Sequence, residues 1–222
     1  MYALRLFHDR LQANAKGWLQ TQHTMIYAWQ GSATVNGAAL LTDAAIYAQD
    51  VVHLEAGGEG ATLWRWEVVP ESDPLHLASG NGCASALRMS RRVKMFEMAP
   101  TSRWLFRLDL IREAEGSTGL HCHPGSGIRC LLSGEFRTES EKGGSSESRR
   151  PGDAWYEEGA YPLVSTAPPG VKTTFLRGMI LPPEFLNYGE TATWIEHRPT
   201  SMVTASGEPR WKVYAQRVIT LR

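Results

Sequence analysis

The sequence is poor in cysteine and has no long apolar run. Its 222 residues contain three cysteines, at positions 83, 122 and 130, and no Cys-X-X-Cys pair. An odd set with this spacing indicates neither a disulfide framework nor a thiolate zinc site. No stretch of eighteen consecutive apolar residues occurs, which argues against a membrane-spanning helix.

Net charge is also absent. Lys plus Arg and Asp plus Glu both number 23, so no excess of positive charge would attract a nucleic acid or another polyanion. The first ten residues lack the long apolar core and the small-residue cleavage site of a secretory signal. With 42% hydrophobic residues the chain can build a core. We therefore expect a cytoplasmic protein that acts on a small molecule and binds neither nucleic acid nor membrane.

Helical periodicity is scarce, and short strands broken by turns dominate the pattern. The step Asn36-Gly37 predicts a tight hairpin between apolar strands at 25–29 and 39–47. The segment 139–150 is rich in Ser, Gly, Glu and Lys, which predicts a polar loop. Residues 211–221 alternate well enough to form an edge strand. Together these patterns predict an all-β protein.

The residues that say most about function are His121 and His123, a His-X-His step in an apolar run. Alternate residues of a strand face the same side, so both imidazoles point to one face, where neutral ring nitrogens can chelate a divalent metal. Two histidines on one strand can also arise by chance and then simply take hydrogen bonds. Cys122 lies between them and faces the opposite side, where it packs as a small hydrophobe.

The layout of residues 119–182 resembles the two sequence motifs of the cupin superfamily. The first motif has the form Gly, His-X-His, Glu, Gly, and here Gly134 follows His123 at the matching distance. The second motif opens with Pro-Gly-Asp, which this chain has at 151–153, and closes with a third histidine. The resemblance implies an antiparallel jelly-roll β-barrel with a metal held in its interior.

Two of the four residues that usually hold a cupin metal are missing. The usual motif glutamate falls on Gly127, and the usual second-motif histidine falls on Leu163 or Pro162. A metal then needs another ligand, and the nearest candidate by position is Glu157, which could equally be a solvated rim carboxylate. Two imidazoles and a carboxylate suit zinc, iron, manganese or nickel and leave positions open for substrate.

Arg129 shares strand parity with His123 and should point into the same interior. A buried guanidinium without a partner is costly, so two interpretations stay open. Arg129 could clamp an anionic or carbonyl oxygen of a substrate through charge-assisted hydrogen bonds. It could instead form an internal salt bridge with Glu135, Glu157 or Glu158.

An internal repeat indicates two similar halves. Residues 26–33 parallel 129–136, and residues 60–70 parallel 170–182. With the cupin resemblance this implies a bicupin, two antiparallel jelly-roll barrels over residues 1–98 and 99–222. The first half has no histidine pair at the matching place, so its site is expected to be degenerate.

The resemblance implies metal chemistry on a small oxygenated substrate. In this family a metal held by histidines and a carboxylate often activates dioxygen to cleave enol or dicarbonyl substrates, and two histidines with one carboxylate suit non-haem iron(II). A dioxygenase-like enzyme is therefore the first hypothesis, with Arg129 orienting an anionic substrate. The expected metal ligands are His121, His123 and Glu157, and the expected pocket walls are Trp155 or Tyr156, which face opposite sides of their strand.

Two other functions remain open. In the first, the metal acts as a Lewis acid on a carbonyl and Glu157 or Tyr161 moves a proton, as in an isomerase, cyclase or lyase. In the second, the barrel is a non-enzymatic binding or sensor module. A homodimer is compatible with each reading, since jelly-roll barrels often pair through their edge strands.

Overall fold

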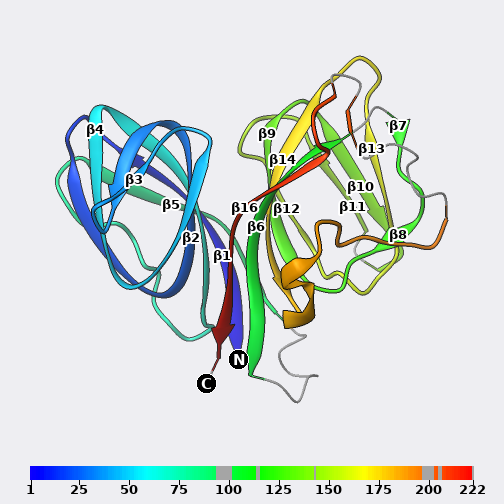
Figure 1. Cartoon of the computed structure of the whole chain (residues 1–222), viewed down its shortest axis with the longest axis horizontal. Coiled ribbons are helices and arrows are strands. Elements are labelled where there is room, and N and C mark those ends of the chain that lie inside the picture. Colours follow the sequence, from blue (N-terminus) through cyan, green and yellow to red (C-terminus); the bar gives the residue numbers. More distant parts are fainter. Residues whose placement is uncertain (94–101, 114–115, 143, 197–202, 205–206, 222) are drawn as a thin grey trace. The chain divides into compact units, whose positions relative to one another are not determined.

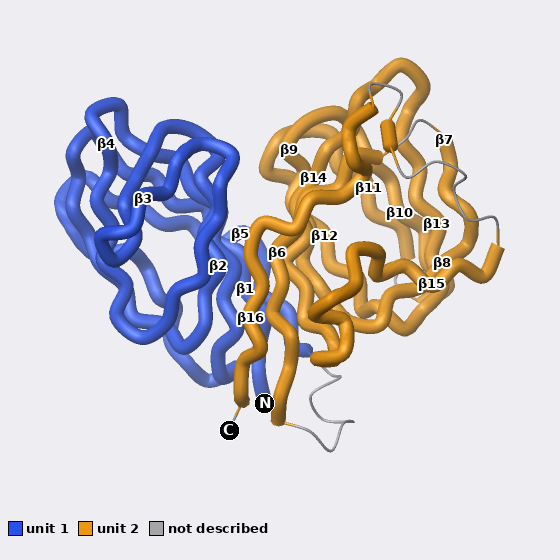
Figure 2. Tube along the Cα trace, viewed as in Figure 1, with its two compact units in different colours: residues 1–98 blue, residues 99–222 orange. Residues whose placement is uncertain are grey.

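The computed structural model describes residues 1–93, 102–113, 116–142, 144–196, 203–204 and 207–221 (Figure 1). Contacts divide the chain into two compact units, unit 1 with residues 1–98 and unit 2 with residues 99–222 (Figure 2). Both consist of antiparallel strands, and the one helix among the described residues is the short 3-10 helix η1, Pro183–Asn187. The prediction of an all-β fold is confirmed. No helix in the described part of the chain is long and apolar enough to cross a membrane.

Unit 1 is a five-stranded sheet in the order β3-β2-β4-β1-β5. Its two longest strands pair with each other twice, so Met25 lies opposite both Tyr47 and Trp66. The predicted hairpin is confirmed, because Asn36 and Gly37 both take positive φ, 50° and 81°, in the turn after β2. The strands are β1 Tyr2–Leu11, β2 Lys16–Val35, β3 Ala38–Leu40, β4 Ala44–Pro70 and β5 Cys83–Arg92.

The interior of unit 1 is apolar except for one buried ion cluster. Arg65 is fully buried and forms ion pairs with Asp9 and with Glu67, whose side chains are also fully buried. A buried charge is tolerated when it is paired and hydrogen-bonded. This cluster gives unit 1 a charged centre inside its sheet.

Unit 2 is a jelly-roll sandwich of two antiparallel sheets. The first sheet has the order β12-β9-β14-β6-β16, and the second has the order β11-β10-β13-β8-β15 with β7 beside β13. Phe136 of the second sheet packs on Trp155 and Phe175 of the first, with ring centroids 5.3 Å and 4.8 Å away. The first-sheet strands are β6 Arg103–Glu113, β9 Gly127–Ser133, β12 Ala154–Glu157, β14 Thr173–Leu181 and β16 Trp211–Thr220. The second-sheet strands are β7 Gly116–Ser117, β8 His121–Cys122, β10 Phe136–Ser140, β11 Gly144–Ser148, β13 Leu163–Ala167 and β15 Thr193–Trp194.

The predicted loop over 139–150 was wrong. Strands β10 and β11 pair as a hairpin there, with Thr138 opposite Ser146. Polar composition does not prevent a strand at a sheet edge, because the ladder is made by backbone groups and one face may be solvated. The expected last strand is present as β16, which pairs with β6 at the edge of its sheet.

Strand register places the candidate residues between the two sheets. Arg129 on β9 lies opposite Trp155 on β12 and opposite Arg177 on β14. His121 on β8, in the other sheet, lies opposite Leu163. Charged and imidazole side chains from both sheets therefore meet in the interior of unit 2.

Candidate functional site

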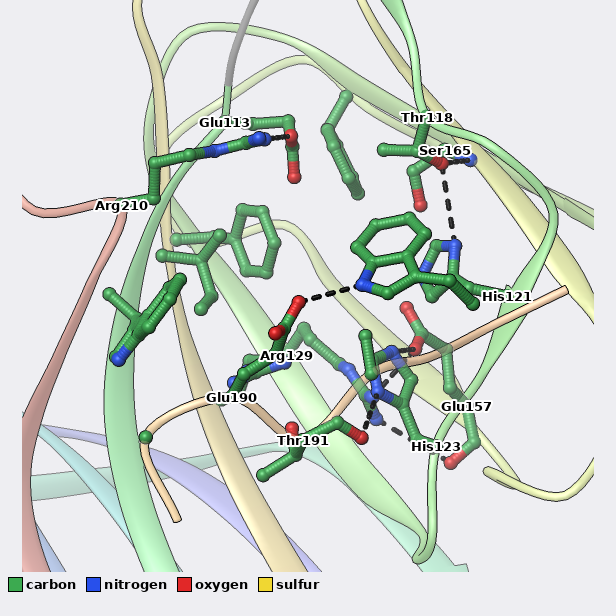
Figure 3. Close-up of a pocket in the computed structure, with 18 residues that line it drawn as sticks. Glu113, Thr118, His121, His123, Arg129, Glu157, Ser165, Glu190, Thr191 and Arg210 are labelled. Carbon is green, nitrogen blue, oxygen red and sulfur yellow. Dashed lines mark hydrogen bonds and ion pairs between the residues drawn. The ribbon is translucent and has the colours of Figure 1, made fainter. Parts of the chain in front are cut away.

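A small cavity lies inside unit 2, between side chains of the two sheets (Figure 3). Its volume is about 80 Å³, enough for a molecule of a few heavy atoms. One part of the wall is polar, and another carries aromatic rings and a second ion pair, Arg210 with Glu113. The polar wall is formed by Thr118, His121, His123, Arg129, Glu157, Arg177 and Thr191.

The two predicted histidines both line this cavity and are almost fully buried. Nδ1 of His121 donates to the carbonyl oxygen of Gly119, 2.9 Å away, and Nδ1 of His123 lies 3.4 Å from the carbonyl oxygen of Thr191. With the proton on Nδ1, each Nε2 keeps its lone pair for another partner.

Burial keeps both imidazoles neutral. It lowers the pKa of His121 below its ordinary value. The pKa of His123 is lowered well below that value, first by burial and then by the positive charges of Arg129 and Arg177. Desolvation and like charges both disfavour the protonated ring, so at neutral pH these histidines can act as ligands.

Glu157 is held by three neighbours. Its Oε2 atom lies 2.6 Å from Nη2 of Arg129 and 3.5 Å from Nε2 of His123. Its Oε1 atom accepts a hydrogen bond of 2.8 Å from the indole nitrogen of Trp155. The carboxylate is therefore fixed at the wall of the cavity, next to one of the two imidazoles.

Arg129 points inward as strand parity predicted and is fully buried. Of its two interpretations, the internal salt bridge with Glu157 is the contact present in the structure. Nη1 also donates to the carbonyl oxygen of Gly127 at 2.6 Å. A Cβ at Gly127 would lie 2.9 Å from Nη1 of Arg129 and 2.7 Å from the carbonyl oxygen of Gly178. The glycine that replaces the usual motif glutamate thus leaves room for the guanidinium.

Arg177, on β14, is a cavity residue that sequence reasoning missed. Its Nε and Nη2 donate to the two carboxylate oxygens of Asp109, each at 2.8 Å. Asp109 also contacts Nε of Arg107 at 3.1 Å. A sequence signal existed, because Arg177 and Arg65 occupy matching places in the repeated segments 60–70 and 170–182.

Thr191 and its neighbours were also missed. Residues 189–192 and Trp194 lie far along the chain from both motifs, yet they line the cavity. Arg107 anchors this segment by donating to the carbonyl oxygens of Tyr188 and Gly189. No local pattern in the sequence indicates this approach, which depends on a buried arginine more than eighty residues earlier.

Three predicted site residues lie away from the cavity wall. Trp155 is buried in the aromatic cluster and reaches the site only through its hydrogen bond to Glu157. Tyr156 faces the other side of β12, as its parity requires, and does not line the cavity. Tyr161 follows β12 and has the ammonium of Lys142 over its ring, 4.5 Å from the centroid. The structure therefore does not place either tyrosine in the wall of the cavity.

The donor set matches a divalent metal in its chemistry. Two ligands held tetrahedrally about 2.0–2.2 Å from a zinc ion lie about 3.4 Å apart, which is close to the 3.5 Å between Nε2 of His123 and Oε2 of Glu157. A metal-ligating histidine usually donates its other nitrogen to a carbonyl, as both do here. Among the described residues, however, no three His, Cys, Asp or Glu side chains are already gathered as a metal cluster.

Comparison with known proteins supports the fold. No protein-family model matches the sequence, and no curated protein matches it. Two solved variants of oxalate decarboxylase from Bacillus subtilis are similar, both at 14% identity, with TM-scores of 0.57 and 0.55. The matched regions cover 86% and 80% of this chain, and 71% and 68% of the two decarboxylase chains. A salicylate 1,2-dioxygenase from Pseudaminobacter salicylatoxidans is similar at a TM-score of 0.49 and 12% identity, over 79% of this chain and 71% of its own. The decarboxylase similarity supports the antiparallel jelly-roll β-barrel fold.

Proposed function

We propose that unit 2 is a metal-dependent cupin enzyme that acts on a small organic anion. The observation that carries this proposal is the placing of two buried, neutral imidazoles beside a carboxylate in one cavity. His121, His123 and Glu157 are the residues that would hold the metal. A divalent metal would supply a Lewis acid and open coordination positions.

The chain's own residues prepare this site in two ways. Desolvation disfavours protonation of the imidazoles, and Nε2 of His123 lies 3.5 Å from Oε2 of Glu157. With its proton on Nδ1, His123 would direct the lone pair of Nε2 at a metal held between the two groups. Arg129 offsets the negative charge of Glu157, and Trp155 holds the other carboxylate oxygen. Both contacts limit the orientations of the carboxylate and keep it directed at the imidazole.

Buried arginines favour an anionic substrate. Arg129 and Arg177 line the cavity, and each can form charge-assisted hydrogen bonds with a carboxylate. Both are held in place by carboxylates of the protein, Glu157 and Asp109. The similar solved proteins carry the name oxalate decarboxylase, which names a small anion of the size this cavity admits.

Two reaction classes can use this donor set. The first is a dioxygenase-like reaction, since two histidines and one carboxylate leave open positions on iron(II). The second is a non-redox lyase, isomerase or cyclase, which the name of the similar decarboxylases favours. Oxygen consumption with diketone and 2-oxo acid substrates, compared with product formation under nitrogen, separates the two classes.

A metal-free binding module is the other candidate function. It is favoured by the Arg129 to Glu157 ion pair, which already gives the carboxylate a cationic partner. It is also favoured because the described residues contain no preassembled cluster of three ligands. In that case the cavity would bind an anion without turnover.

Elemental analysis tests the proposal. The wild-type protein, a His121→Ala/His123→Ala double variant and a control, His53→Ala, are measured as purified and after anaerobic reconstitution with iron, zinc, manganese and nickel. His53 is an exposed residue of unit 1 and should not matter. We expect about one equivalent of one metal in the wild type and control and none in the folded double variant. No metal in any sample would leave the binding module as the function.

We further infer that unit 1 is a second, degenerate cupin barrel, so that the chain is a bicupin. Arg65 and Asp9 of unit 1 form a buried pair that corresponds to Arg177 and Asp109 of unit 2. The similar decarboxylases cover 80–86% of the chain, more than either unit contains. The lack of a histidine pair in unit 1 supports a packing role for it.

A further inference from the structure

We propose that Arg177 and Thr191 bind a carboxylate group of the substrate in the unit 2 cavity. This inference rests on the proposed function, because it assigns the substrate contacts of the same site. It differs from the sequence-based expectation, which gave this role to Arg129.

Arg177 has one guanidinium nitrogen left for a ligand. Asp109 accepts hydrogen bonds from Nε and Nη2, which fixes the plane of the guanidinium. Nη1 forms no hydrogen bond or ion pair with another described residue, and the side chain lines the cavity. A guanidinium held by a bidentate carboxylate is preorganised to bind a second anion with its free edge.

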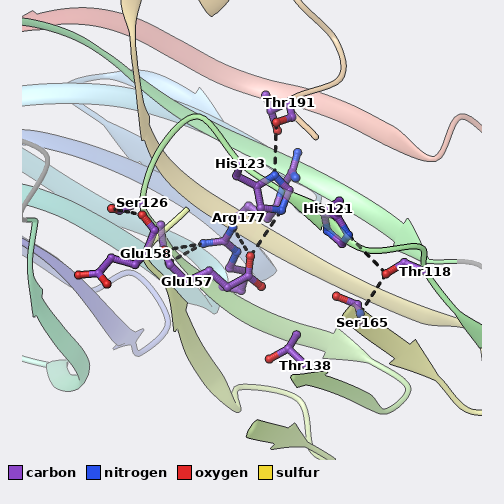
Figure 4. Close-up of polar contacts among 12 residues, drawn as sticks. Thr118, His121, His123, Ser126, Thr138, Glu157, Glu158, Ser165, Arg177 and Thr191 are labelled. Atoms are coloured by element: carbon purple, nitrogen blue, oxygen red, sulfur yellow. Dashed lines mark hydrogen bonds and ion pairs between the residues drawn. The ribbon is translucent and has the colours of Figure 1, made fainter. Parts of the chain in front are cut away.

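Thr191 provides a second unused donor. The residue is only 2% exposed and lines the cavity, and its Oγ1 has no hydrogen-bond partner among the described residues. A buried hydroxyl of this kind carries a desolvation penalty until a partner reaches it. Figure 4 shows Thr191 on one side of His123, with Arg177 and Glu157 on the other. The carbonyl oxygen of Thr191 lies 3.4 Å from Nδ1 of His123, and Thr191 and Arg177 both line the cavity.

Arg129 has both of its terminal nitrogens engaged, whereas Arg177 keeps one terminal nitrogen for a ligand. Its Nη1 donates to the carbonyl oxygen of Gly127, and its Nη2 is paired with Glu157. The two arginines lie directly opposite each other on β9 and β14, where like charges repel. Glu157 compensates Arg129, whereas Asp109 is shared between Arg107 and Arg177.

A carboxylate can use both donors. Its two oxygens can accept from Nη1 of Arg177 and from Oγ1 of Thr191, and its negative charge strengthens the hydrogen bond from the guanidinium. A neutral amide of the same size can accept only through its carbonyl oxygen and without that charge. These donors thus favour small carboxylic acids over their amides.

Calorimetric titration with oxalate, pyruvate and the neutral analogue oxamide tests the assignment. The proteins are the wild type, Thr191→Val and the control Thr193→Val, which makes the same change at an exposed position two residues away. Thr191→Val removes an unpartnered hydroxyl, so it should fold as the wild type does. We expect about a tenfold or greater loss of affinity for the anions in Thr191→Val and none in Thr193→Val. Wild type should bind oxalate at least about tenfold more tightly than oxamide.

Arg177→Lys tests the other residue of the proposed carboxylate site, which Arg177 and Thr191 form together. Lysine keeps the positive charge but cannot bind Asp109 bidentately and also present a third nitrogen. We expect anion affinity to fall at least about tenfold in this variant, with folding checked by thermal unfolding. If both Thr191→Val and folded Arg177→Lys bind as the wild type, or if neither anion binds wild type saturably, the assignment is wrong.

Metal content measured on the same samples separates this inference from the proposed function. If the wild type contains metal and both variants keep their anion affinity, the assignment of Arg177 and Thr191 is wrong, while the metalloenzyme proposal remains. If the wild type contains no metal but its anion binding depends on Thr191, the metalloenzyme proposal is wrong and the assignment of Arg177 and Thr191 is supported.

Discussion

Nη2 of Arg129 lies 2.6 Å from Oε2 of Glu157, inside the cavity where a metal is expected. The same carboxylate oxygen lies 3.5 Å from Nε2 of His123. Glu157 therefore stands between a permanent cation and a neutral imidazole. Its charge therefore affects both the stability of unit 2 and the proposed metal binding.

Glu157→Gln should destabilise the protein by about 3–5 kcal/mol, because it leaves the charge of Arg129 buried without a carboxylate. Urea unfolding measures the loss. The control is Glu147→Gln, which removes an exposed carboxylate from surface ion pairs and should cost about 1 kcal/mol or less. Equal stability of the two variants would show that the buried pair contributes no more than a surface one.

Gly127→Ala should lower the free energy of unfolding by about 1–3 kcal/mol. The new methyl group would approach the carbonyl oxygen of Gly178 and the guanidinium of Arg129 too closely, so one of them must move. Thermal unfolding provides the measurement. Gly58→Ala is the matched control, since a Cβ there meets no atom within 4 Å. A neutral Gly127→Ala would mean that the site has more room than the structure shows.

Stability should depend on pH through His121 and His123. Their folded-state pKa values are lowered below the ordinary value of about 6.5. As the pH falls, the unfolded chain then binds protons that the folded chain does not. The contribution of the two histidines to the free energy of unfolding is therefore complete above about pH 6.5 and decreases below it. Urea unfolding at pH 8 and pH 5.5, with chelator present, should show a larger loss for the wild type than for His123→Asn. Identical losses would mean that His123 is not buried as a neutral ring.

Trp155→Phe should weaken metal binding by about tenfold while the protein stays folded. Phenylalanine keeps a ring against Phe136 and Phe175 but cannot donate to Oε1 of Glu157. Competition with a metal-chelating dye gives the affinity, and Trp18→Phe at a half-exposed position of unit 1 serves as the control. Unchanged affinity would remove Trp155 as the residue that positions Glu157.

Several features of this protein could be predicted from short stretches of sequence. Asn36 and Gly37 encode their hairpin because both residues tolerate the positive φ that such a turn needs. The prediction that His121, His123 and Arg129 face one interior was correct, although β8 and β9 are separate strands in different sheets, so parity along a single strand does not connect them. The resemblance of the surrounding residues to cupin motifs led to a jelly-roll fold, which the solved structures support.

The sequence did not determine which residues form ion pairs with the buried arginines. Arg129 was expected to contact either a substrate oxygen or one of three glutamates, and only the pairing of β9 with β12 brings it to Glu157. Arg177 faces Asp109 because β14 pairs with β6, although 68 residues separate the two in sequence. The polar composition of residues 139–150 also led to a wrong prediction of a loop, because backbone hydrogen bonding at a sheet edge needs no apolar pattern.

The sequence alone therefore determined which residue types face the interior of unit 2, since the two-residue period of a strand sets that direction. The tertiary structure decided which of these charges form pairs and which donors keep no partner. Strand register and the anchoring of residues 189–192 by Arg107 fix those distances, and they depend on contacts between segments remote in the chain. Arg177 and Thr191 could be recognised as a pair only because these long-range contacts place them at one cavity.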